Sequence, residues 1–254
     1  MFRIGLGVRV ESDGSAHGGG RSTATGRGVW LRKWPEGPSR ASPLSQARIA
    51  GAAVALLDEG GPDRLTMRGL AQRLQVSATA LYWHVTSRED VLDLAFDHVF
   101  AQVRIPEPGP EWTLDVERLV VGWHAAMLRH PWSPALVGRP MLGPNVLART
   151  ESLQSALVRG GLTGRTLALA THLLANYAIG AALVEATWQR GQDPAVRAEA
   201  QAHLAARTDL YPTLNEHGHL DDRWPDEELF AAGVHTILGA VTHDAAARRT
   251  RRRP

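Results

Sequence analysis

The chain has no cysteine among its 254 residues. Disulfide bonds and thiolate metal sites are therefore excluded, and the composition is compatible with a reducing cytoplasm. Uninterrupted apolar runs stay well below the roughly 18 residues that a membrane-spanning helix needs. The N-terminal MFRIGLGVRV has neither the long apolar stretch nor the small-residue cleavage site of a signal peptide. We expect a cytoplasmic protein with no segment in a membrane.

An excess of charge is missing as well, because the net charge is only +2. Bulk attraction to nucleic acid is therefore weak, and any such binding has to depend on a local patch. Sustained β alternation is also lacking, whereas apolar residues recur with helical spacing along most of the chain. The sequence predicts an all-α fold.

The segment RIPEPGPE, with three prolines and a glycine, is the clearest internal boundary. It predicts a small helical domain over residues 44–104 and a larger one over 105–247. Within the larger domain, helices are predicted at residues 112–130, 144–159, 163–190, 194–208 and 226–247.

Both ends of the chain have biased composition. Residues 1–43 are rich in Gly, Ser and Arg without apolar periodicity, which predicts disorder. Two alternatives are an arm that binds DNA phosphates through Arg27, Arg32 and Lys33, or a mis-assigned gene start. The basic tail, residues 248–254, is typical of a solvated helix end, with non-specific attraction to DNA as the alternative.

Two short amphipathic segments, LTMRGLAQRL and VSATALYWHV, lie next to each other before the boundary. Thr66 and Ser77 are expected to cap the two helices. Only Gln75 and Val76 separate the segments, too few residues for antiparallel packing but suitable for a tight helix-turn-helix corner.

The second helix of this corner has a small polar face. Ala78, Thr79 and Tyr82 lie within about 100° of one another, whereas Leu81 and Val85 occupy another sector. Such a face suits insertion into the DNA major groove, where Ala78 and Thr79 can contact base edges. The Tyr82 hydroxyl can meet a phosphate, and the alternative is a half-buried core tyrosine.

Other polar side chains lie close to this face. Arg68 can donate two hydrogen bonds to guanine, and Arg88 can contact the DNA backbone. The His84 ring can donate to a phosphate or, alternatively, cap a neighbouring carbonyl. Trp83 is expected to pack in the core against the first and fourth helices.

The run from Ile49 to Val99 resembles the DNA-binding domain of the TetR/AcrR family of transcriptional regulators. LTMRGLAQRLQVSATALYWHVTSRE is similar to the tetracycline-repressor branch, which shares LYWHV. Gln75 stands where the family usually has glycine, which places a left-handed residue in the turn. Ala78 replaces a larger polar base-reading residue, so we expect a different operator. With Ser77 included for its capping position, the expected DNA-binding residues are Thr66, Arg68, Ser77, Ala78, Thr79, Tyr82, His84 and Arg88.

The resemblance implies that the larger domain binds a ligand and dimerises. Its long apolar helix is interrupted by polar residues that could orient a small molecule. The expected ligand-binding residues are Trp123, Met127, His172, Asn176, Tyr177 and Glu185. Alternatively, His172 and Asn176 satisfy each other, and the tryptophans fill the core. The small residues Ala178, Gly180, Ala181 and Ala182 are expected at a dimer seam with residues 228–249.

The sequence thus predicts a homodimeric regulator, most simply a repressor, released from a palindromic operator in double-stranded DNA by a small-molecule effector. We expect no cofactor, metal or catalytic residue. Ala135 stands where the tetracycline repressor carries a metal-binding histidine, which argues against a magnesium–tetracycline effector. The alternative is a helical metal-binding protein or enzyme that uses a loop with His217, His219 and Asp221. The chain has no nucleophile elbow, phosphate loop or HExxH motif.

Overall fold

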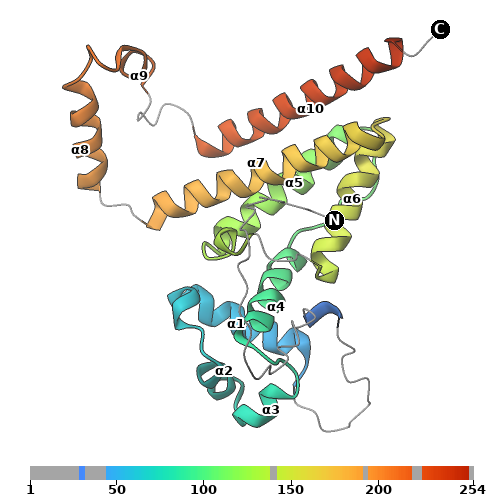
Figure 1. Cartoon of the computed structure of the whole chain (residues 1–254), viewed down its shortest axis with the longest axis vertical. Coiled ribbons are helices and arrows are strands. Elements are labelled where there is room, and N and C mark those ends of the chain that lie inside the picture. Colours follow the sequence, from blue (N-terminus) through green and yellow to red (C-terminus); the bar gives the residue numbers. More distant parts are fainter. Residues whose placement is uncertain (1–28, 32–43, 138–141, 191–193, 219–224, 252–254) are drawn as a thin grey trace, which may run out of the picture.

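The computed structural model describes residues 29–31, 44–137, 142–190, 194–218 and 225–251, and these residues contain no β-strand. The prediction of an all-α fold is confirmed (Figure 1). The α-helices are α1 (Gln46–Gly60), α2 (Met67–Leu74), α3 (Ala78–Tyr82), α4 (Arg88–Ala101), α5 (Trp112–Arg129), α6 (Pro144–Arg159), α7 (Gly164–Arg190), α8 (Pro194–Ala205), α9 (Pro212–Glu216) and α10 (Asp226–Arg251). The described residues also form three short 3-10 turns, which are η1 (Val29–Leu31), η2 (Pro62–Arg64) and η3 (Pro134–Leu136).

The four N-terminal helices form the lower part of the molecule in Figure 1. Helix α1 packs against α2 and α4, with Ile49, Ala53 and Leu57 buried on one face. A hydroxyl side chain caps the start of each helix and accepts a backbone N–H from three residues further on. Caps of this kind contribute about 1 kcal/mol each, which helps to define such short helices. The capping residues are Ser45, Thr66, Ser77 and Ser87.

One part of the N-terminal extension departs from the prediction of disorder. Residues 29–31 form η1, which packs against α4. Val29 is buried and Trp30 packs against the same core. The apolar pair Val29–Trp30 is therefore sufficient to fix a turn within a polar segment. Arg27, Arg32 and Lys33, the residues of the predicted DNA-binding arm, lie outside the described residues.

Helix α4 connects the two halves of the molecule, since it packs against α1 and also against α5 and α6 (Figure 1). Asp97 of α4 accepts hydrogen bonds from the Val146 backbone at 3.0 Å and from Asn145 at 2.7 Å, both in the first turn of α6. In return, the buried Arg149 of α6 donates to the carbonyls of Ala101 and Val103 at the end of α4. Each helix therefore caps the other.

Helices α5, α7 and α10 pack against one another in the upper part of the molecule. One face of α7 is buried, and an apolar row on the opposite face is exposed. By length and composition alone, residues 164–188 of α7 are able to cross a membrane, a weak indication because the core helix of a globular protein passes the same test. Helices α8 and α9 contact each other beyond the ends of α7 and α10 (Figure 1).

Candidate functional site

The helix-turn-helix corner is formed by α2, Gln75 and α3. Gln75 adopts the left-handed conformation (φ 58°, ψ 42°), and among the described residues it is the one non-glycine residue with positive φ. This conformation turns the Val76 N–H back to the Ala71 carbonyl at 3.0 Å, which closes α2. The left-handed turn expected at Gln75 is confirmed.

The surface of α2 and α3 presents polar groups outward. Arg68, Ala78 and Thr79 are exposed, and Tyr82 is 49 % exposed. The Thr66 hydroxyl accepts the Gly69 N–H at 3.0 Å, and the Ser77 hydroxyl accepts the Ala80 N–H at 3.1 Å. Because a hydroxyl accepts and donates at the same time, both still have a proton to donate outward. The residues behind this surface are buried: Leu70, Ala71, Leu74 and Leu81.

The expectation that Trp83 packs in the core is wrong. Its side chain is 79 % exposed and does not pack in the core. Helix α3 ends at Tyr82, and the buried row of the corner is completed by Leu81 and Val85, both fully buried. Trp83 follows Leu81 by two positions, about 200° around the helix axis, so it points away from that row. This exposed ring enlarges the outward surface beside Tyr82. The two-residue spacing between Leu81 and Trp83 is the sequence feature from which this exposure could have been predicted.

His84 and Arg88 lie at the edge of this surface. His84 is half-buried. Arg88 donates from Nε to the Leu65 carbonyl at 3.0 Å and from Nη2 to the Pro62 carbonyl. Its guanidinium thus ties the segment between α1 and α2 to the start of α4. The geometry gives Arg88 a role inside the domain and does not favour the expected phosphate contact.

The expected ligand residues of the larger domain fall into two groups. Trp123 and Met127 of α5 are buried, and the half-buried Glu185 reaches His124 of α5, with 3.2 Å between Oε2 and Nε2. Tyr177 stacks on Phe230 of α10 with ring centroids 5.1 Å apart. His172 and Asn176 are exposed, so the expectation that they point into the interior is wrong. The helical period explains this result, because the row facing inward on α7 consists of Ala170, Leu174, Ala178, Ala182 and Ala186.

The same period corrects the expected dimer seam. Ala178 and Ala182 are fully buried within the chain's own core, whereas Gly180 is exposed. The outward face of α7 carries larger side chains, each at least 39 % exposed: Leu169, Leu173, Leu183, Val184 and Trp188. Small residues therefore bring α7 close to its own neighbours, and the exposed row is aliphatic and aromatic.

The contact between His124 and Glu185 lies in a desolvated environment. The His124 ring is buried and stacks on Phe230 with centroids 4.0 Å apart. Burial lowers the pKa of His124, and the nearby Asp226 and Glu227 oppose this shift only in part. Burial also raises the pKa of Glu185, and the same two acids add to that shift. Both directions favour an uncharged pair over an ion pair.

An aromatic cluster connects α4 to α5. The ring centroids of Phe96 and Phe100 are 5.0 Å apart, and those of Phe100 and Trp123 are 6.1 Å apart. Trp123 Nε1 is buried and has no hydrogen-bond partner within the described part of the chain. A buried indole N–H without an acceptor is unfavourable, and a ligand that offers an oxygen would relieve that cost.

The metal-site alternative gains no support from the part of the chain that the structure describes. Those residues contain no group of three His, Cys, Asp or Glu side chains able to hold a metal ion. His217 is exposed at the end of α9. His219 and Asp221 lie outside the described residues.

Two protein-family models match the chain. Residues 49–95 match the model described as bacterial regulatory proteins of the tetR family, and residues 105–241 match the tetracyclin repressor-like C-terminal domain. The chain belongs to the TetR family. Its members are transcriptional regulators, so the protein is a DNA-binding transcriptional regulator with a helix-turn-helix.

Known TetR-family proteins resemble the chain along most of its length. An HTH-type transcriptional regulator of Saccharopolyspora erythraea is 44 % identical over 189 residues, which cover 73 % of this chain and 79 % of that protein. The HTH-type transcriptional repressor DrrR1 of Streptomyces coeruleorubidus is 27 % identical and covers 95 % of this chain and 96 % of its own. Among solved structures, ActR of Streptomyces coelicolor in complex with actinorhodin matches with a TM-score of 0.72 and 29 % identity, covering 80 % of this chain and 99 % of that chain.

Proposed function

We propose that the protein is a cytoplasmic, homodimeric repressor that binds a palindromic operator through α2 and α3 and releases it when a small molecule binds the larger domain. The observation that carries the proposal is the outward surface of the corner, where exposed polar and aromatic side chains stand on a fully buried apolar row. The similarity to the repressor DrrR1 supports repression as the mode of action.

The proposed DNA contacts divide by chemistry. Arg68 reads guanine, and Ala78 and Thr79 contact base edges in the major groove. Hydrogen-bond donors at the rim of the surface hold phosphates and set the register without reading sequence. These donors are Thr66, Ser77, Tyr82 and His84. Trp83 joins them as an exposed ring that packs against the sugar–phosphate backbone.

The proposed effector binds beside the aromatic cluster of Phe96, Phe100 and Trp123. A planar aromatic molecule matches these rings, and an oxygen on it would accept the buried N–H of Trp123. The ligand-bound structure of the related ActR, with actinorhodin, supports a small-molecule effector. Because Phe96 and Phe100 belong to α4, a ligand at this place contacts the helix that connects the two domains.

A mobility-shift titration tests DNA binding. The probe is the DNA upstream of the gene, searched for an inverted repeat. Arg68→Ala is expected to weaken operator binding by roughly 1–3 kcal/mol and to relax base choice at one position in each half-site. Arg118→Ala, an exposed arginine of α5, is the matched control and is expected to bind normally. Normal binding and unchanged base preference in Arg68→Ala would overturn the assignment of this residue as base reader.

A further inference from the structure

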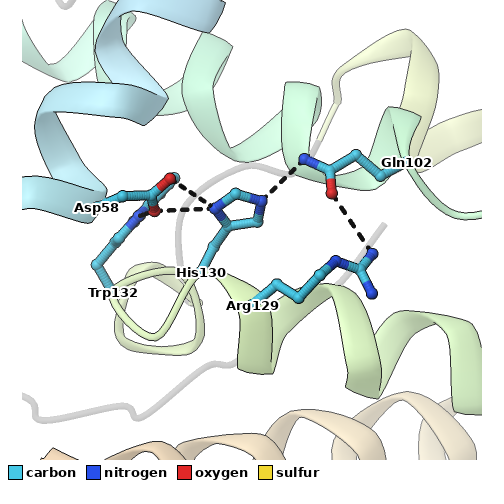
Figure 2. Close-up of polar contacts among 5 residues, drawn as sticks. All are labelled: Asp58, Gln102, Arg129, His130 and Trp132. Atoms are coloured by element: carbon cyan, nitrogen blue, oxygen red, sulfur yellow. Dashed lines mark hydrogen bonds and ion pairs between the residues drawn. The ribbon is translucent and has the colours of Figure 1, made fainter.

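Five side chains from both domains form one hydrogen-bonded network (Figure 2). His130, at the end of α5, lies 2.8 Å from Asp58 in the last turn of α1 through Nδ1, and 2.8 Å from the Gln102 amide through Nε2. Trp132 donates from Nε1 to Asp58 Oδ1 at 2.6 Å. Arg129 donates to Gln102 Oε1 at 3.4 Å. Gln102 is the C-terminal cap residue of α4, so the ends of α1, α4 and α5 meet at His130.

The two ends of the network determine the direction of its hydrogen bonds. Asp58 only accepts, so His130 Nδ1 carries the hydrogen between them. Arg129 only donates, so the Gln102 oxygen faces Arg129 and its NH₂ group faces His130. His130 Nε2 is then the acceptor. Every donor points toward the carboxylate of Asp58, and in such a chain each bond polarises the next.

Asp58 belongs to a helix that is firmly attached to the helix-turn-helix. Arg48 of α1 donates to the Leu74 carbonyl at the end of α2 at 3.1 Å, and Glu59 of α1 forms an ion pair with Arg73 of α2 at 2.7 Å. Helix α1 also packs along α4. A change in the direction of α1 is therefore a change in the direction of the recognition surface.

We propose that Asp58, His130 and Gln102 are positioning residues for operator binding: through them the larger domain fixes the angle at which α1 holds the helix-turn-helix. The proposal rests on the operator binding proposed above. Trp132 and His130 are buried, with residue exposures of 2 % and 9 %, so they form a rigid support. Hydrogen bonds are directional and apolar contacts are not, so this network fixes an angle that packing alone leaves adjustable.

The angle of the helix-turn-helix matters because a dimer reads two half-sites about one helical turn, 34–36 Å, apart. If the angle of either DNA-binding domain varies, only a fraction of the population matches that spacing, and the apparent affinity falls by that fraction. A purely structural role for the network predicts a different outcome, namely lower stability with the interdomain angle unchanged.

The interdomain angle can be measured without DNA or effector. Since the chain lacks cysteine, Gln72→Cys in α2 and Arg118→Cys in α5 give two unique, exposed positions for spin labels. Labelled protein is mixed with excess unlabelled protein so that the within-chain distance dominates the pulsed electron paramagnetic resonance signal. Asp58→Ala is expected to broaden or shift this distance distribution. Asp63→Ala, which removes an exposed carboxylate shortly after the end of α1, is expected to leave it unchanged.

Operator binding is then measured in the same variants without labels. Asp58→Ala is expected to bind about 5- to 30-fold more weakly than Asp63→Ala, a range typical of coupling between two sites. The dependence of affinity on salt is expected to match that of the parent protein, because the phosphate contacts are unchanged. The double variant Asp58→Ala/His130→Ala should bind about as well as the weaker single variant, because both substitutions break one network.

Two results would overturn the proposal: a distance distribution in Asp58→Ala equal to that of Asp63→Ala, or equal operator affinity for these two variants. If Asp58→Ala does not fold, Gln102→Ala decides by the same two measurements, because Gln102 is exposed and its truncation leaves the buried groups in place. A parent protein that binds no operator contradicts the proposed function, and the distance measurement still tests the network.

Discussion

At the scale of single residues, Gln75 shows that the fold tolerates a non-glycine residue in the left-handed conformation. A non-glycine residue in the left-handed region costs about 1–2 kcal/mol, and glycine avoids this cost but loses about 0.5–1 kcal/mol of chain entropy on folding. Gln75→Gly is therefore expected to raise the free energy of unfolding by about 0.5–1 kcal/mol. Urea titration checks this.

The matched control for this change is Gln72→Gly, in the same helix at an exposed position with ordinary helical geometry. It is expected to lower the free energy of unfolding by about 1 kcal/mol, the cost of glycine in a helix interior. Equal signs for the two variants would contradict the strain argument at Gln75.

Trp83 permits a second test at this scale. Because its side chain is 79 % exposed, Trp83→Ala is expected to change the free energy of unfolding by less than about 0.5 kcal/mol. The same truncation at the fully buried Trp132 is expected to cost about 3–5 kcal/mol. Thermal and urea unfolding of both variants check this. A large loss of unfolding free energy in Trp83→Ala would show that this side chain packs in the core.

The geometry of the proposed DNA-binding surface was largely predictable from sequence because its residues are neighbours along two short helices. Capping at Thr66 and Ser77, and the exposure of Ala78 and Thr79, follow from helical geometry alone. The internal role of Arg88 was not predictable, because its acceptors, Leu65 and Pro62, are more than twenty positions away in the chain.

At the scale of helices, apolar periodicity and Pro/Gly breaks place most boundaries well. Residues 144–159 were expected to form a helix, and α6 spans Pro144–Arg159. Helix α9 was missed because its five residues, PTLNE, lie among prolines, glycines and polar residues that indicate a loop. The reciprocal caps between α4 and α6 were also hidden, since Asp97 and Arg149 are charged residues with no local signal for burial.

Gly143 gives a test of the reciprocal caps. A Cβ atom added there would lie 2.1 Å from Asp97 Oδ1, so Asp97 would have to move away from the first turn of α6. Gly143→Ala is expected to lower the free energy of unfolding by about 1–3 kcal/mol, the cost of leaving buried hydrogen-bond partners unsatisfied. Gly51→Ala in α1 is the control, because the nearest atom to its Cβ, His98 Nε2, lies 4.0 Å away. That change is expected to stabilise α1 by up to about 1 kcal/mol, which urea titration resolves.

The packing of α5 against α7 and α10 predicts a pH dependence. Burial lowers the pKa of His124 from its ordinary value of 6.5, so below that value the unfolded chain binds a proton that the folded chain does not. Stability therefore falls as the pH drops from about 7.5 to 5.5, by at most about 1.4 kcal/mol per pH unit for one group. Glu185 acts in the opposite direction, because its raised pKa favours proton uptake by the folded chain.

Replacing Glu185 removes its opposing effect on the pH dependence, so that the contribution of His124 can be measured. In Glu185→Gln, the free energy of unfolding is expected to fall as the pH falls through this window. Adding His124→Asn to that variant is expected to flatten the profile, as measured by urea titration at each pH. Parallel profiles for the single and double variants would show that His124 does not titrate differently in the folded and unfolded chains.

At the scale of the whole molecule, the two domains are joined by α4 and by the network around His130, and an apolar face of α7 stays exposed. Leu169, Leu173 and Leu183 are each about 40 % exposed there, and Val184 and Trp188 more so. An exposed row of this kind on a long helix indicates contact with another protein surface. The sequence alone predicted dimerisation through this helix but assigned the wrong residues, because the buried and exposed faces of α7 are both apolar.

The proposed dimer leads to a last prediction. In a two-fold symmetric interface each residue of the seam occurs twice, so Leu173→Glu places two like charges in one apolar contact. This variant is expected to be monomeric in sedimentation velocity and folded by circular dichroism, because Leu173 is 41 % exposed in the single chain. Operator binding should fall steeply in a mobility-shift titration, because one protomer addresses one half-site. Leu147→Glu on α6, where the leucine is 48 % exposed, is the matched control and is expected to remain dimeric and to bind DNA. If Leu173→Glu is still a dimer that binds operator with parental affinity, the seam lies on another face of the molecule.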